Sequence, residues 1–333
     1  MYPAARQLLW QDGERTLRAG PGAVAEAPAL LARHGFERFA LLCTARSQAL
    51  AEPLAAVAAA LLHVPDGGVP EAAAAVLDRV PQTPLVALGG GRVIDVAKAI
   101  GSARGLPVAA VPTTLSGAEM NAHHRPIAGH ESAQRRRPVL VVTDGRLLTS
   151  LGRPALAATA MNALAHATEA LVTPAANPVA EGASLEAARQ IAHGLGDDLD
   201  TDALALGGLL AGYAMGLTGF AVHHVVCQSL VRLAGTPHAA TNAVMLPHTV
   251  RLLTSRCPRE IALFGLTLDG DGDAAGAVAR LAAIAGPTRL RQLGLDRSSI
   301  DSVVTAALER SQLAATPDPP GREELHRLLE SAY

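Results

Sequence analysis

Three consecutive glycines between an apolar run and a helix-forming run give the clearest chemical signal in the sequence. The stretch LVALGGGRVIDVAKAIG covers residues 85–101 and predicts a strand, a tight turn at Gly89, Gly90 and Gly91, and a helix. Glycines let backbone N–H groups approach a phosphate, and the helix N-terminus adds partial positive charge. The spacing is neither GxGxxG nor that of a P-loop, so it predicts an anion-binding turn without identifying the ligand.

Asp95 and Lys98 lie one turn apart in the same predicted helix. They could form an ion pair on the surface or reach a bound ligand. Lys98 is the only lysine among the 28 lysines and arginines of the chain. Because an arginine would serve a surface pair equally well, the single lysine favours a role at the anion-binding turn.

A cluster of hydroxyl groups follows the next apolar run. The segment VPTTLSGAE at 111–119 places Thr113, Thr114 and Ser116 just after a predicted strand. In open α/β sheets ligands bind beyond the carboxyl ends of the strands, so these hydroxyls could line such a crevice. Hydroxyl-rich segments are also common in ordinary turns, and the segment alone does not decide between the two.

Histidines and one asparagine give a third candidate site. Asn162 and His166 are four residues apart in MNALAHATEAL, so they share one helix face, and His224 and His238 follow in VHHVVCQSLVRLAGTPHAA. Three imidazoles and an amide oxygen could hold Fe²⁺ or Zn²⁺ with one position open for substrate. With 12 histidines in the chain, hydrogen-bonded core histidines are the competing interpretation.

The elements that must position these residues differ between the two halves of the chain. Up to residue 150, apolar runs alternate with alanine-rich runs, which is typical of βαβ units around a parallel sheet. Strands are expected at 39–43, 62–64, 85–88, 107–111 and 138–142, and helices near 24–34, 47–61, 70–80 and 93–103. Later segments predict only helices, near 154–172, 177–194, 202–217 and 219–233. We therefore expect a Rossmann-like, doubly wound α/β domain over 1–150 and an all-helical domain over 151–333.

Composition narrows the class of protein. Apolar residues make up 49% of the chain, charged residues 17%, and the net charge is −2. We therefore expect no nucleic-acid partner and no membrane span. The three cysteines follow no CxxC spacing, which favours a reducing compartment such as the cytoplasm. The LDGDGD segment at 268–273 lacks the ligand spacing of a calcium loop and predicts a plain turn.

Taken together, GGGRVIDVAKAIG, VPTTLSGAE, the Asn162–His166 helix and the later histidines resemble the iron-containing alcohol dehydrogenase superfamily, most closely its maleylacetate reductase branch. The resemblance extends from RAGPGAVAEAPALLARHG at 18–35 to the final ELHRLLESAY. It implies a dehydroquinate synthase-like fold, in which a cleft between an N-terminal dinucleotide domain and a helical domain holds nicotinamide and substrate. A homodimer is also implied.

Position by position, the resemblance assigns NAD(P)(H) to the N-terminal motifs. The implied cofactor-binding residues are Gly89, Gly90, Gly91, Asp95, Lys98, Thr113, Thr114, Ser116, Thr44 and Arg46. No acid follows the first nucleotide strand to hold a ribose 2′-hydroxyl, and Arg46 there favours a 2′-phosphate, so we expect tolerance of NADPH. Arg92 replaces the serine that usually follows the three glycines.

The implied metal ligands are Asn162, His166, His224 and His238. Asparagine stands where metal-dependent relatives have aspartate, which removes a negative charge and makes Fe²⁺ or Zn²⁺ doubtful. Gln228 replaces a histidine that relatives commonly use as proton donor.

The resemblance implies an NAD(P)H-dependent reductase of a small, carboxylated carbonyl or enoate compound, such as maleylacetate. We expect His166, His224, His238 and His124 to act in catalysis, with His123 and Arg125 free to meet carboxylates unless they lie in a solvated loop. A metal-dependent alcohol or polyol dehydrogenase and a non-redox biosynthetic enzyme of the same fold are the alternatives.

Overall fold

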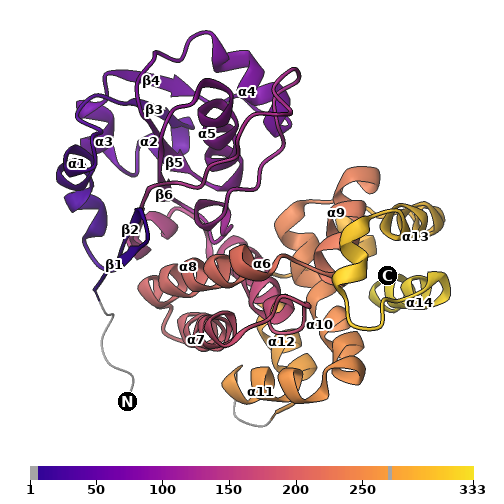
Figure 1. Ribbon diagram of the computed structural model, residues 1–333. Helices are drawn as coiled ribbons and strands as arrows, with labels where there is room; N and C mark the ends of the chain where they lie inside the picture. The colour runs from indigo at the N-terminus through magenta and orange to yellow at the C-terminus, as the bar shows by residue number, and fades with distance from the viewer. Residues whose placement is uncertain (1–6, 269–271) are drawn as a thin grey trace. The chain divides into compact units, whose positions relative to one another are not determined.

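The computed structural model describes residues 7–268 and 272–333, and its N-terminal part is built on a seven-stranded sheet (Figure 1). The strand order is β1-β2-β7-β6-β5-β3-β4, and only the β1–β2 pair is antiparallel. The strands are β1 (Leu8–Asp12), β2 (Arg15–Ala19), β3 (Ala40–Cys43), β4 (Ala60–His63), β5 (Leu85–Gly89), β6 (Val108–Pro112) and β7 (Leu140–Thr143). The expected parallel sheet is therefore present.

The strand order places a topological switch point between β3 and β5. The chain leaves β3 toward β4 at one edge of the sheet, and it leaves β5 in the opposite direction toward β6. Loops that diverge in this way open a crevice at the carboxyl ends of the strands, where ligands bind in doubly wound sheets. The segments that follow β3 and β5 are those that contain Arg46 and the three glycines.

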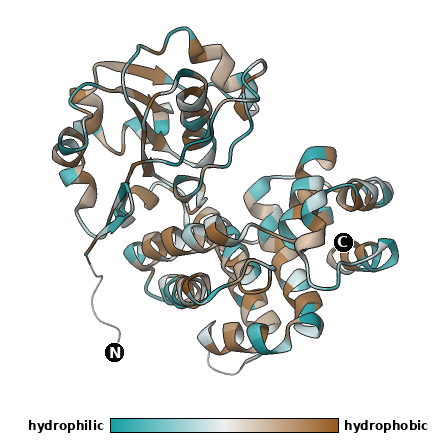
Figure 2. Ribbon diagram, viewed as in Figure 1, coloured by the Kyte–Doolittle hydropathy of each residue, from teal (hydrophilic) through white to brown (hydrophobic). Residues whose placement is uncertain are grey.

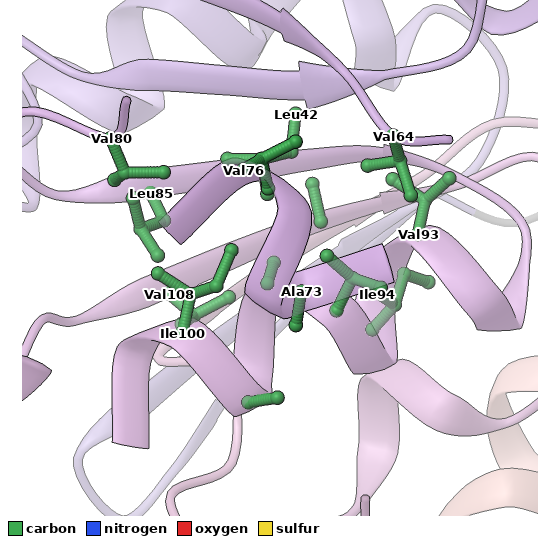
Figure 3. Packing of buried hydrophobic residues seen from close by; sticks show 14 of the residues in the cluster. Leu42, Val64, Ala73, Val76, Val80, Leu85, Val93, Ile94, Ile100 and Val108 are labelled. Carbon is green, nitrogen blue, oxygen red and sulfur yellow. The ribbon is translucent and has the colours of Figure 1, made fainter. Parts of the chain in front are cut away.

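Helices cover both faces of this sheet. Helices α1 (Ala23–Arg33) and α3 (Glu52–Val57) pack with Leu41 and Leu88 on one face. Helices α4 (Val69–Leu77) and α5 (Gly91–Arg104) pack on the other face, where Figure 3 shows Leu42, Leu85 and Val108 against Val76 and Ile100. Alternate residues of each strand thus enter different cores, which explains why the central strands are apolar throughout.

The segment 47–61, expected as one helix, is divided into three elements. Helix α2 (Ala45–Gln48) is capped by Thr44, helix α3 begins beside Pro53, and Ala60 and Leu61 belong to strand β4. The alanines favour a helix locally, but pairing with β3 fixes an edge strand there. The N-terminal hairpin of β1 and β2 was not among the expected strands, although the family-like segment at 18–35 begins within β2.

The C-terminal part is helical, as expected. Its helices are α6 (Arg153–Ala170), α7 (Pro178–Gly194), α8 (Thr201–Thr218), α9 (Val222–Ala234), α10 (His238–Arg256), α11 (Pro258–Leu268), α12 (Ala274–Ala283), α13 (Ile300–Leu308) and α14 (Arg322–Ala332). Helix α6 is buried along almost its whole length, and α10 packs against α6, α9 and α12. Because α6 is buried from Leu156 onward, it can hold polar side chains away from water. Of the LDGDGD segment, residues 269–271 lie outside the described part.

The chain forms two compact units that do not divide at a single residue. The first contains the residues up to Ser150 together with Thr201–Leu209, and the second contains Leu151–Asp200 and Leu210–Tyr333. The first turns of α8 belong with the sheet because Gly145 N–H donates to the Asp202 carboxylate over 3.0 Å. In the same helix, Gly208 lies so close to Leu115 that a Cβ would be 2.7 Å from Leu115 Cδ2.

Within the described residues, no single helix has the length and apolar character needed to cross a membrane. Helices α8 and α9 meet the length and composition criteria only as a pair, and they are bent by 102° at their junction. Most of α8 is hydrophobic, whereas α14 carries hydrophilic and hydrophobic residues along its length (Figure 2).

Candidate functional site

The glycine turn joins β5 to α5 and leaves no room for side chains. A Cβ on Gly89 would lie 2.7 Å from Val93 Cγ2, and one on Gly91 would lie 2.9 Å from Ser116 Cβ. Backbone N–H groups at the start of α5 therefore stay open to a ligand. The tight packing behind the glycines makes this turn a preformed cradle for an anion.

The structure brings the predicted hydroxyl residues to this cradle. Thr113 N–H donates to the Gly89 carbonyl over 3.0 Å, which fixes the segment after β6 beside the turn. A Cβ on Gly90 would meet the Thr114 side chain at 3.1 Å, and Ser116 lies against Gly91. Two motifs separated by more than 20 residues in the sequence thus form one surface at the carboxyl edge of the sheet.

Arg46 supplies a cation at the same edge. Thr44 caps α2, so Arg46 lies in the first turn after β3, exposed to solvent. Its Nη1 donates to Ser150 Oγ over 2.6 Å, and its Nη2 is 3.5 Å from Thr113 Oγ1. The contact with Thr113 places this guanidinium beside the hydroxyl segment.

Arg92 follows the glycines but is held by the loop after β4. It donates to the Pro65 carbonyl over 2.5 Å and to the Asp66 carboxylate over 2.8 Å. Asp66 is fully exposed, so this ion pair contributes little to stability.

Lys98 is buried, which excludes the surface ion pair as an interpretation. Its side chain is inaccessible to solvent, and Nζ lies 2.8 Å from the Asp95 carboxylate. The same ammonium donates to the carbonyls of Ala118 (2.8 Å) and His123 (2.6 Å). Lys98 thus holds the segment after the hydroxyl motif, and we expect it to affect the cofactor through that segment.

The segment 118–125 is fixed from a second side. Arg15, also buried, donates through Nη1 to the Met120 carbonyl over 2.9 Å. The Glu119 carboxyl is 2% exposed, and burial raises its pKa to about 7. Sequence reasoning did not single out this buried acid, whose only sign was the Glu at the end of VPTTLSGAE.

His124 is part of this segment and has no ring nitrogen left for a substrate. Its Nδ1 donates to the Arg125 carbonyl over 3.2 Å, so its Nε2 accepts from Ser102 Oγ over 3.0 Å. Burial lowers the pKa of His124, in agreement with a neutral ring. The expected catalytic role of His124 therefore finds no support in its contacts, whereas His123 and Arg125 are exposed.

The second site lies on α6, α9 and α10. Asn162, His166 and Glu169 occur at positions i, i+4 and i+7 of α6, so they share one buried face. His224 of α9 stacks on His166, with ring centroids 4.6 Å apart and an angle of 11° between the planes. His238 begins α10 and is exposed.

Glu169 organises the two histidines at the start of α9. Its Oε2 lies 2.6 Å from His224 Nδ1, and its Oε1 accepts from the His223 backbone N–H over 2.6 Å. These N–H groups stabilise the carboxylate even though burial raises the pKa of Glu169. A carboxylate can only accept, so His224 carries its proton on Nδ1 and presents Nε2 as a lone pair.

His223 is a structural member of this cluster. Its Nε2 donates to Asn242 Oδ1 over 2.9 Å, and its Nδ1 lies 2.8 Å from Thr249 Oγ1. Burial lowers the pKa of His223 to about 4 and that of His224 to about 3. Both rings are therefore neutral at physiological pH.

Three polar atoms in this cluster are buried and have no partner: Asn162 Oδ1, His166 Nδ1 and His224 Nε2. Burial and the neighbouring histidines also hold the pKa of His166 well below its usual range. Buried polar atoms without partners are rare in folded proteins, and they indicate a site that a polar ligand completes. The cluster therefore offers neutral hydrogen-bonding groups to a substrate.

Sequence reasoning found three members of this cluster but missed Glu169. The signal was present, because Glu169 extends the four-residue spacing of Asn162 and His166 by one helical turn. Arg310 was also missed. Its guanidinium donates through Nη2 to Gln228 Oε1, and the two residues are 82 positions apart in the chain. No local pattern could reveal such a contact.

Comparisons with known proteins match both parts of the chain. A model of the C-terminal part of the Fe-containing alcohol dehydrogenase family matches residues 156–333, and a model of iron-containing alcohol dehydrogenase matches residues 18–150. "Maleylacetate reductase 1" of Rhodococcus opacus is 34% identical, over 75% of this chain and 72% of that protein. "Maleylacetate reductase 2" of Cupriavidus pinatubonensis is 32% identical, over 94% and 93%.

Solved structures show the same relationship. The maleylacetate reductase from Rhizobium sp. strain MTP-10005 superposes with a TM-score of 0.86 at 26% identity, over 98% of both chains. The family models together cover most of the chain, and the reductases match both of its parts. The chain therefore belongs to the iron-containing alcohol dehydrogenase family, in its maleylacetate reductase branch, and is an NAD(P)-dependent oxidoreductase.

Proposed function

We propose that the chain uses NAD(P)H to reduce a small carboxylated enoate or carbonyl compound of the maleylacetate type. The observation that carries this proposal is the buried cluster around His166 and His224, whose three unpartnered polar atoms suit an oxygen-rich substrate. The named relatives that are 31–34% identical supply the substrate class. Reduction of maleylacetate in this way gives 3-oxoadipate.

We assign the cofactor to the cradle of the first unit. A Cβ would fill the space at Gly89, Gly90 and Gly91, so the turn suits the close approach of a pyrophosphate. Thr113, Thr114 and Ser116 lie along the same surface, and Arg46 offers a cation for a 2′-phosphate. Bound NAD(P)H supplies a hydride to the electrophilic carbon of the substrate.

The histidine cluster stabilises the charge that this transfer creates. Hydride addition to the C=C bond moves an electron pair onto the conjugated oxygen, and a proton then adds to the neighbouring carbon. Neutral His166 carries one N–H, which can donate to this oxygen as a neutral electrophile. His224 Nε2 accepts a hydrogen bond from substrate or water, because Glu169 holds the ring proton on Nδ1.

The cluster contains no proton donor of ordinary strength. Burial lowers the pKa of His166, His223 and His224, so none of these rings is protonated near pH 7. Gln228 cannot act as an acid either. We infer that water supplies the proton that completes the reduction.

The family is named for iron, but the residues present do not fit a tightly held divalent ion. Asn162 offers an uncharged oxygen, His238 is exposed, and the stacked rings of His166 and His224 direct their lone pairs along nearly parallel planes. No group of three or more His, Cys, Asp or Glu side chains in residues 7–268 and 272–333 could hold a metal ion. The proposed mechanism therefore includes no step through a metal.

The cellular compartment, the oligomeric state and the partners of the enzyme are also proposals. The substrate is a small molecule. We propose a cytoplasmic homodimer with no nucleic-acid or membrane partner. Support comes from the net charge of −2, the buried free thiols of Cys43, Cys227 and Cys257, and exposed Leu9 on edge strand β1, which a second copy could cover.

An activity comparison tests the function. Purified protein of measured metal content is mixed with NADH or NADPH and with maleylacetate, short-chain aldehydes or polyols, and the absorbance of the reduced nicotinamide is followed. Oxidation with maleylacetate in the presence of a chelator is the expected result. Turnover of aldehydes or polyols only, abolished by the chelator, would instead indicate a metal-dependent alcohol dehydrogenase. Absence of saturable cofactor binding would indicate a non-redox enzyme.

A further inference from the structure

Gln228 and Arg310 form a hydrogen-bonded pair that has no role in the proposed reduction as described above. Gln228 lies on α9, four residues after His224, so the two side chains occupy the same helix face one turn apart. Arg310 precedes the short helix η5 (Ser311–Ala315), which packs against α9. The Arg310 guanidinium therefore reaches the histidine-bearing face of α9 at Gln228.

The chemistry of the pair fixes the orientation of the amide. A guanidinium has only donors, so Gln228 must turn its oxygen toward Arg310. The amide nitrogen, with both of its N–H groups, then lies at the other end of the planar carboxamide. Gln228 is only half-buried, so these N–H groups are not sealed inside the protein.

A charged donor on the amide oxygen also strengthens the amide N–H groups as donors. Hydrogen bonds in a chain polarise one another, and the effect is larger where water is scarce. Neutral donors held in a fixed orientation are the groups that stabilise an oxyanion in many enzymes. An imidazole at this position would exchange a proton, whereas the Gln228 amide keeps the same donors at every pH.

We propose that Gln228 donates an amide N–H to the oxygen on which negative charge develops during reduction. Arg310 is the positioning residue that holds the amide in this orientation. The inference rests on the proposed reductase function. It assigns stabilisation of the charge to Gln228 together with His166, and it separates this task from proton supply.

Two substitutions separate the roles of the pair. Gln228→Glu keeps the shape and the bond to Arg310 but replaces the N–H groups with an oxygen. We expect kcat to fall about a hundredfold, which is typical for loss of one oxyanion donor, with the KM for NAD(P)H unchanged.

Arg310→Met frees the amide to rotate and should lower kcat about tenfold, and Arg310→Lys should recover part of this loss. Arg232→Met, which removes an exposed arginine one turn further along α9, is the matched control and should leave kcat unchanged.

The double variant and a pH profile exclude a purely structural role. If Arg310 acts through Gln228, Arg310→Met should cause no further loss of kcat in the Gln228→Glu background. Gln228→His should introduce an ionisation near the ordinary histidine pKa of about 6.5 into the profile of kcat. Thermal unfolding followed by circular dichroism reports whether each variant is folded.

The outcomes distinguish this inference from the proposed function. An active wild type together with an active Gln228→Glu variant would overturn the inference alone. Equal losses from Arg310→Met in both backgrounds would show that Arg310 does not act through Gln228. A wild type that reduces none of the substrates would overturn the proposed function, and the inference would fail with it.

Discussion

The cofactor cradle and the histidine cluster are built on opposite principles. The cradle depends on side chains that are absent, because a Cβ on Gly89 or on Gly91 would lie within 3 Å of a neighbouring side-chain atom. The cluster depends on side chains that are present. Glu169 orients His224, and three buried polar atoms of the cluster have no hydrogen-bond partner within the protein. The first is therefore sensitive to added volume, and the second to a change of charge or hydrogen-bonding type.

Glu169→Gln should produce the largest effect, because it disturbs the cluster without changing its volume. The new amide would place an N–H against either the His223 backbone N–H or His224 Nδ1–H, where the carboxylate now accepts both. We expect kcat/KM to fall about a thousandfold as His224 loses its tautomer, as in other enzymes that lose the acid behind a histidine. Steady-state kinetics measure this loss.

The exposed Glu181→Gln on α7 is the matched control and should be neutral. The affinity for NAD(P)H should stay unchanged in both variants, because the cradle is not involved. A Glu169→Gln enzyme that keeps kcat/KM within about threefold of wild type would contradict the assigned role.

Gly91→Ala tests the cradle by adding volume to the turn without changing its charge. The added methyl group would lie 2.9 Å from Ser116 Cβ, so the turn or the hydroxyl segment must move. We expect the Kd for NADH to rise about a hundredfold, since the N–H groups at the start of α5 lose their position. Calorimetric titration measures the change.

Gly182→Ala adds the same methyl group on α7, where no atom lies within 4 Å, and is the control. It should leave the Kd unchanged and stabilise the helix slightly. Unaltered NADH affinity in Gly91→Ala would show that the cofactor does not approach this turn.

The comparison also explains what the sequence could predict. Gly89, Thr113 and His166 were found because each lies in a short pattern with a local physical reason, such as a tight turn or a shared helix face. The central strands were found because burial on both faces makes them continuously apolar. Local patterns of this kind cover the sheet, the long helices and most candidate site residues.

The remaining features depend on contacts between distant segments. The alanine-rich run 47–61 forms strand β4 only because β3 offers a partner. Burial of Lys98 depends on the carbonyls of Ala118 and His123, and the orientation of Gln228 depends on Arg310. A list of residue types shows none of these contacts, so neither the burial of Lys98 nor the hydrogen bonds of His124 could be predicted from it.

Glu119→Gln examines a buried acid of the segment that follows the hydroxyl residues of the cradle. Burial raises the pKa of Glu119 from 4.5 to about 7, so the folded state binds the proton more tightly than the unfolded state. Wild-type stability should therefore decrease as the pH rises from about 4.5 to 7. Glutamine cannot ionise, so the variant should lack this loss and be more stable at pH 8 by on the order of 2 kcal/mol.

Urea unfolding at pH 4.5 and pH 8 measures this difference. Glu71→Gln, at the start of α4, removes an exposed acid from the same unit and is the control. Equal pH dependence in wild type and Glu119→Gln would show that folding does not raise the pKa of Glu119.

Asn162→Asp tests whether the missing negative charge is what prevents the cluster from binding a metal ion. The substitution replaces the amide nitrogen with an oxygen and adds a negative charge beside His166, which strengthens the site for a divalent ion. We expect the affinity for Zn²⁺ or Co²⁺ to rise about tenfold, limited by the stacking of His166 on His224 and by the exposure of His238. Asn177→Asp adds the same charge at the N-cap of α7, where aspartate is well tolerated, and should leave metal affinity unchanged. Equal affinities in wild type and Asn162→Asp would mean that the arrangement of the rings, rather than the missing charge, keeps the ion out. A wild type that already binds the ion tightly would show that the site needs no charge at position 162, and would contradict the description of the cluster as a metal-free site.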